Sequence, residues 1–186
     1  MRLGNCGRLA LSPINAVWFR AIAPHHLATA LRTSQSLGVR TRFSPGGIEI
    51  LYLAENQTTA LYEVGAILGP PSRPVANPAR TKFALLDIHV KLRSVADLTD
   101  PVQQALLNVS LQELTGEWDP YTDEDAPTQK LGSALFATKK IKGFLAPSAP
   151  ASLNKNLIVF PQKLLKGSEL VFEDTSPSGT IHRIGG

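Results

Sequence analysis

Short apolar runs, each bounded by turn-forming residues, limit most strongly what this chain can fold into. β-Branched and aromatic residues are dense over residues 15–22 and 48–54, and such short runs are typical of strands. The same reasoning predicts further strands over residues 82–90, 144–146, 157–160 and 169–173, the last at a sheet edge. None of these runs approaches the roughly 20 apolar residues that a membrane-spanning helix needs.

Helical patterns separate these runs. A helix is predicted over 58–68, where apolar residues recur at three- and four-residue spacing before Gly69-Pro70-Pro71. Asp100-Pro101 predicts the start of a second helix over 101–109, because Asp caps a helix and proline fits its first position. We also predict a helix over 128–137, an acidic loop over 117–125 and a frayed tail over 176–186.

Strand and helix patterns therefore alternate without internal repeats, which predicts a mixed α/β (α+β) fold. The chain has 186 residues, of which 43% are hydrophobic and 18% charged. These values favour one compact domain over residues 1–186 and argue against disorder.

The single cysteine, Cys6, cannot form an internal disulfide, so nothing requires an oxidising compartment. Pro13, Asn15 and Arg20 interrupt the apolar residues near the N-terminus, which excludes a signal peptide. We therefore expect a cytoplasmic protein without membrane association. The formal charge of +4 favours anionic ligands in general but does not choose among them.

Several common site motifs are absent. The sequence contains neither G-x-G-x-x-G nor G-x-x-x-x-G-K-[ST]. His25-His26 reads as a solvated pair whose side chains point opposite ways on an extended chain, and the acidic residues 119–125 lack the pattern of a calcium loop. We therefore expect no metal site, and no catalytic role for Cys6.

Four residues bracket one strand–helix unit and together suit chemistry on a nucleotide. Arg20 and Arg42 offer planar guanidinium groups that pair with phosphates. Tyr52 offers a ring that stacks on a base, and Glu63 a carboxylate that stabilises positive charge on a sugar. Taken singly, Arg42, Tyr52 and Glu63 are better explained as a surface cation, a core aromatic and a solvent-facing helix position.

The segment R-F-S-P-G-G-I-E-I-L-Y-L-A-E-N-Q-T-T-A-L-Y-E, residues 42–63, resembles the signature of the RES family, in which Arg, Tyr and Glu recur in this order. V-W-F-R at 17–20 is similar to the family's opening strand. T-Q-K-L-G-S-A-L-F, G-F-L-A-P-S-A and N-L-I-V-F-P resemble its second half. The similarity covers about residues 17–161. Phe43-Ser44 replaces the Trp-Asn that many members carry, which puts any contact of that asparagine in doubt.

This resemblance implies a fold related to ADP-ribosyltransferases and a toxin that cleaves the nicotinamide–ribose bond of NAD. NAD is then the substrate, and no cofactor is needed. The resemblance implies that Arg42 and Arg20 hold the phosphates, that Tyr52 packs near the nicotinamide and that Glu63 supports bond cleavage. Ser148 and Asn156 complete the pocket, although a turn and a loop end explain them equally well. Gln129 and Trp118 are interpreted as a helix-cap neighbour and a core aromatic.

The resemblance also implies an antitoxin partner, a helix-turn-helix protein of the Xre class. Three functions remain open: NAD degradation with water or inorganic phosphate as acceptor, ADP-ribosyl transfer to a macromolecule, and a basic nucleotide- or RNA-binding module without catalysis. The last is disfavoured because aromatic residues are not interleaved with a Lys/Arg stripe. We therefore expect no direct nucleic-acid binding.

Overall fold

The structure is a computed structural model that describes residues 1–80, 82–117, 119, 124–151, 153–174 and 179–186. Its strands are β1 Leu11–Ile22, β2 Leu51–Ala54, β3 Ile67–Leu68, β4 Val75–Ala76, β5 Ala84–Asp97, β6 Gly143–Pro147, β7 Lys155–Val159, β8 Glu169–Glu173 and β9 Ile181–Gly185. Its α-helices are α1 Gln57–Glu63, α2 Pro101–Leu107, α3 Leu111–Thr115 and α4 Pro127–Ala137. Short 3-10 helices are η1 Leu3–Arg8, η2 Pro24–Thr29, η3 Ser34–Gly38 and η4 Pro161–Lys163. This arrangement confirms the predicted mixed α/β fold.

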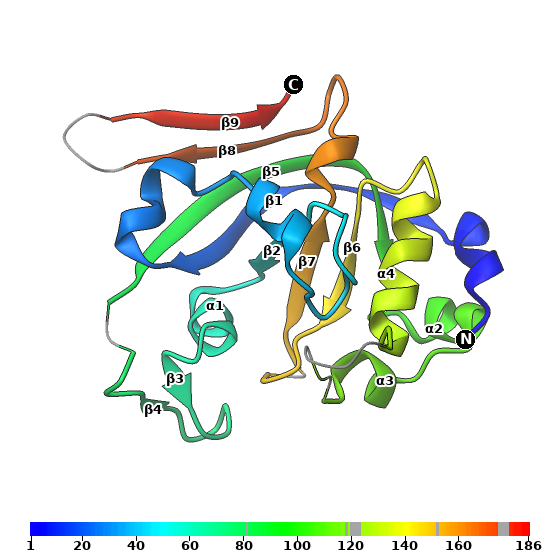
Figure 1. Cartoon of the computed structure of the whole chain (residues 1–186), viewed down its shortest axis with the longest axis horizontal. Helices are drawn as coiled ribbons and strands as arrows, with labels where there is room; N and C mark the ends of the chain where they lie inside the picture. Colours follow the sequence, from blue (N-terminus) through cyan, green and yellow to red (C-terminus); the bar gives the residue numbers. More distant parts are fainter. Residues whose placement is uncertain (81, 118, 120–123, 152, 175–178) are drawn as a thin grey trace.

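One large sheet organises the molecule (Figure 1). Its strand order is β1-β2-β7-β6-β5-β8-β9, and β1 also pairs with β5, so that the strands from β1 to β5 close on themselves. The β1–β5 pairing is antiparallel and runs from Leu11 opposite Ala96 to Ile22 opposite Ala84. β2 and β7 therefore have a hydrogen-bonded neighbour on each side, which fixes the positions of the residues they carry.

β5 extends to Asp97, beyond the predicted end at residue 90. Buried and exposed residues alternate from Leu86 to Arg93, and the last four residues of the strand break this pattern with Val95 and Ala96 both buried. Leu86, Ile88, Val90 and Leu92 face a core cluster that also includes Trp18. A second cluster packs α2, α3 and α4 against the sheet, with large members such as Leu107, Leu131 and Phe144. Figure 1 shows these three helices grouped at one end of the sheet.

The helix predicted over 58–68 is wrong at its C-terminal end, because α1 stops at Glu63. Gly65 has φ +67°, a left-handed conformation that favours glycine and ends helices. Its N–H donates to Tyr62 O, and the next N–H, of Ala66, reaches back to Leu61 O. The residues assigned to the last helical turn instead form β3, so Leu68 is 49% exposed rather than packed inward.

Two further predictions about the C-terminal part are corrected. β8 is not an edge strand, because β9 pairs with it from Glu173–Ile181 to Glu169–Gly185. For the same reason the tail is ordered over Ile181–Gly185, where Phe172 and His182 stack with ring centroids 5.6 Å apart. The predicted loop over 117–125 falls largely on residues outside the described part.

The helices predicted over 101–109 and 128–137 are confirmed as α2 and α4, within a residue or two at their ends. Asp100 caps α2 as expected, accepting a hydrogen bond from Val102 N at 2.8 Å. Within the described residues, no helix is long and apolar enough to cross a membrane.

Candidate active site

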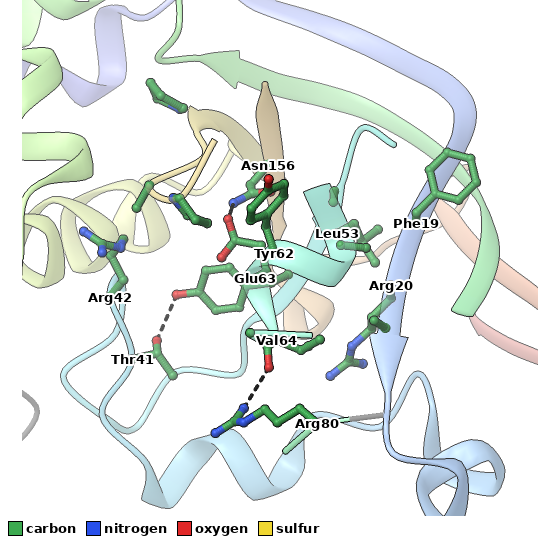
Figure 2. A pocket seen from close by; sticks show the side chains of 18 of the residues that line it. Phe19, Arg20, Thr41, Arg42, Leu53, Tyr62, Glu63, Val64, Arg80 and Asn156 are labelled. Carbon is green, nitrogen blue, oxygen red and sulfur yellow. Dashed lines mark hydrogen bonds between the residues drawn. The ribbon is translucent and has the colours of Figure 1, made fainter. Parts of the chain in front are cut away.

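A cleft of about 820 Å³ opens between the sheet and α1. It collects residues from distant parts of the chain (Figure 2). Its charged and polar lining side chains are Arg20, Thr41, Arg42, Tyr52, Tyr62, Glu63, Asn77, Arg80 and Asn156. The cleft thus brings together five of the six predicted site residues, and the sixth, Ser148, is hydrogen-bonded to Glu63 of the lining.

Glu63 is held through one carboxylate oxygen. Its Oε1 accepts hydrogen bonds from Ser148 Oγ at 2.6 Å and from Asn156 Nδ2 at 2.5 Å. Ser148 is 0% exposed and Asn156 is 7% exposed, whereas Glu63 itself is exposed. The structure thus places Asn156 in the cleft lining and Ser148 beside it, and both side chains donate to the Glu63 carboxylate.

Local structure places Glu63 at the last residue of a short helix. Asn56 caps α1 by accepting hydrogen bonds from Thr59 N and Thr59 Oγ1, at 2.8 and 2.9 Å. A carboxylate at a helix C-terminus is unfavourable, because it meets the negative end of the helix dipole. The two donors from Ser148 and Asn156 offset this cost, which is typical of a residue placed for chemistry rather than stability.

Tyr52 projects from β2 with its hydroxyl fixed by the preceding loop. The hydroxyl accepts from Phe43 N at 3.1 Å and donates to Thr41 Oγ1 at 3.0 Å. Burial raises the pKa of Tyr52 to about 12, so the phenol is neutral at physiological pH. Its ring is therefore held rigidly on the cleft wall, where a flat ligand group can pack against it.

Two predicted arginines line the cleft and keep their charge. Burial lowers the pKa of Arg20 to about 10, and its Nη1 donates to Ala30 O at 2.5 Å. Burial also lowers the pKa of Arg42, while Glu63 and Tyr52 oppose this shift. Arg42 Nη1 donates to Gly116 O at 2.6 Å. Each guanidinium thus has one anchored nitrogen and further N–H groups for a ligand.

Gln129 of α4 holds the loop that carries Arg42. Its Nε2 donates to Thr41 O at 2.9 Å, and its Oε1 accepts from Ala126 N at 2.9 Å, which confirms the predicted cap role. Ser44 is 0% exposed, and its Oγ accepts from Gly46 N at 3.1 Å. Ser44 therefore shapes the loop and does not face the cleft. Trp118 lies outside the described residues.

Three residues that the sequence analysis set aside, His25, His26 and Cys6, do not line the cleft. His25 and His26 are exposed as expected, but they lie on η2 with ring centroids 4.1 Å apart, so the predicted opposite orientation is wrong. Cys6 is 2% exposed, and burial raises its thiol pKa. Among the described residues, no three His, Cys, Asp or Glu side chains gather where they could hold a metal ion.

Sequence reasoning missed Arg80 and Asn77, which line the cleft from the turn between β4 and β5. No recognised motif surrounds them, and they lie in a Pro- and polar-rich stretch that reads as an ordinary loop. Only the tertiary structure brings them to the cleft.

Comparisons with known proteins agree with this architecture. A chain in the crystal structure of the M. tuberculosis MbcT–MbcA toxin–antitoxin complex has a similar fold, with a TM-score of 0.68 and 18% sequence identity. The match covers 98% of this chain and 91% of that chain. No curated protein sequence matches significantly. The family model described as the RES domain matches residues 17–177, and the chain therefore belongs to the RES domain family.

Proposed function

We propose that this protein degrades NAD by cleaving the nicotinamide–ribose bond, and that it acts as the toxin of a bacterial toxin–antitoxin pair. The observation that carries the proposal is the way in which the Glu63 carboxylate is held in the cleft. The carboxylate is anchored through one oxygen by Ser148 and Asn156, at a cleft that also exposes arginine side chains and a fixed tyrosine ring.

The cleft has a suitable size and charge for a dinucleotide. A volume of about 820 Å³ lies within the range of roughly 300–1,000 Å³ for small-molecule sites. The described lining carries three guanidinium groups, those of Arg20, Arg42 and Arg80, and one carboxylate, that of Glu63. The excess positive charge complements the two negative charges of a diphosphate.

The chemistry follows from the carboxylate. As the C1′–N1 bond breaks, its electron pair moves to the nicotinamide nitrogen, and positive charge builds on the ribose. Glu63 stabilises that charge and orients the 2′-hydroxyl, as carboxylates do in glycosidic reactions. Water or inorganic phosphate then forms the new bond to C1′, and water releases a proton as it adds.

An antitoxin partner follows from the same proposal. A protein that consumes NAD without control poisons the cell that makes it. The neighbour of similar fold is a component of a toxin–antitoxin complex. We propose a helix-turn-helix partner of the Xre class that covers the cleft between Arg42 and Glu63.

Incubation of the purified protein with NAD, with and without phosphate, tests the proposal. We expect release of nicotinamide together with ADP-ribose, or with ADP-ribose phosphate when phosphate is the acceptor. A mass increase of about one ADP-ribose on a protein or nucleic acid would instead identify a transferase. Unchanged NAD under all conditions would contradict catalysis and favour a binding module.

A further inference from the structure

The turn between β4 and β5 fastens the chain immediately after Glu63. Arg80 Nη1 donates to Val64 O at 2.7 Å. Asn77 Nδ2 donates to Gly65 O at 2.8 Å, and Asn77 N donates to Ala66 O at 2.8 Å. Three consecutive carbonyl groups beyond the end of α1 are thus held by one turn, which is itself closed by the bond from Arg80 N to Asn77 O at 3.0 Å.

Arg80 reaches the cleft as well as this turn. Its side chain is exposed, so its remaining N–H groups stay available to a ligand. Figure 2 shows Arg20 and Arg80 below Glu63 in this view and Arg42 to its left. All three arginines line the same cleft, and Arg20 and Arg80 reach it from different elements, β1 and the turn after β4.

We propose that Arg80 is a second anion-binding residue of this site, which takes a phosphate of the dinucleotide together with Arg20 and couples its binding to the position of Glu63. The proposal rests on the proposed function for the identity of the substrate. A phosphate bound to Arg80 would contact a guanidinium that already donates a hydrogen bond to Val64 O, the carbonyl of the residue that follows Glu63. Substrate binding and carboxylate placement are therefore linked through one guanidinium.

Arg80→Met tests the charge, because methionine removes the charge and the donors while keeping an extended side chain. Arg80→Lys restores the charge alone. Arg73→Met is the matched control, since Arg73 is exposed on the nearby β3–β4 connection and is not part of the cleft lining. ADP serves as the probe, because it carries the diphosphate but has no nicotinamide bond to break.

We expect calorimetry to give an ADP affinity about 10-fold weaker for Arg80→Met, which corresponds to one charge-assisted contact. Arg80→Lys should recover most of this loss, and Arg73→Met should bind like the wild type. With NAD, Arg80→Met should raise KM, whereas Asn77→Ala, which loosens the turn without removing charge, should lower kcat more than it raises KM.

Equal ADP affinity in the wild type and Arg80→Met overturns the proposal, as does a wild type that does not bind ADP. Should Arg80→Met melt early, Arg80→Gln takes its place with the same criterion. ADP binding requires no turnover, so this test stands apart from the proposed function. If the wild type leaves NAD intact, and the Arg80→Met variant binds ADP more weakly than the wild type, the proposed activity is refuted while the role of Arg80 is supported.

Discussion

At the scale of single residues, the two oxygens of Glu63 differ. Oε1 receives both protein donors, from Ser148 and Asn156, and no hydrogen bond to Oε2 is found within the described part of the chain. An exposed helix-end carboxylate would ordinarily have many rotamers. Two short hydrogen bonds to buried donors restrict it to one, with the second oxygen left for a substrate.

Glu63→Gln should fold normally and lose most NAD cleavage. Its amide oxygen can still accept from Ser148 and Asn156, but it supplies no negative charge to the ribose. Loss of a transition-state contact worth about 3–4 kcal/mol slows turnover roughly 10²–10³-fold. Nicotinamide release is the measurement, with Glu173→Gln on the exposed end of β8 as the control. Near-normal release by a normally melting Glu63→Gln protein would remove Glu63 from the mechanism.

At the scale of elements, α4 supports the loop that presents Arg42. A Cβ atom on Gly132 would lie 1.9 Å from Phe43 O, so the helix backbone and the loop backbone touch directly. Because the obstructing atom belongs to backbone, no side-chain rotation relieves the contact. The glycine thus permits the close approach on which the Arg42 loop depends.

Gly132→Ala should therefore destabilise the protein and displace the Arg42 loop. Overpacking of this kind costs about 2–3 kcal/mol, which in a domain of this size lowers the melting temperature by about 4–12 °C. Ser133→Ala, one residue along α4, is the control. A wild-type melting temperature for Gly132→Ala would show that α4 does not approach Phe43 this closely.

At the scale of the whole molecule, β9 completes the sheet. It pairs with β8 over five residue positions, from Ile181 to Gly185. Each cross-strand pair contributes about 0.2–1 kcal/mol. The strand lies away from the cleft, so it contributes stability rather than chemistry.

Truncation after Asp174 should lower the melting temperature by at least about 2 °C. Thermal unfolding of the truncated and full chains measures this, with removal of Gly186 alone as the control. A frayed tail would predict no difference. Equal melting temperatures would therefore restore the sequence-based interpretation of this segment and contradict the β8–β9 pairing.

Much of the fold follows from local sequence patterns. Strands such as β5 are recognised by the alternation of apolar and polar residues along them. That alternation continues in the sequence to Leu92, so the end predicted at residue 90 was premature. The end of α1 was missed because apolar spacing continued through Ile67 and Leu68 while Gly65 had already ended the helix. Closure of the sheet depends on long-range pairing, which no local pattern encodes.

The site divides in the same way. Arg42 shortly precedes the strand–helix unit that carries Tyr52 and Glu63, so their chemistry could be considered together from the sequence. Ser148 and Asn156 were reached only through the family resemblance, and nothing in the sequence showed that they bond to the same oxygen of Glu63. Arg80 depends on the turn at residues 77–80, and its contact with Val64 O exists only in the folded protein.

The hydrogen bond between Asn156 and Glu63 joins residues 93 positions apart. A ribosome adds about 5–20 residues per second, so roughly 5–20 s separate the synthesis of the two residues. β7 must then pair with β2 before the carboxylate is fixed. The growing chain therefore passes most of its synthesis without an assembled site, so the antitoxin proposed above would meet the chain before Glu63 is fixed if it is present during translation.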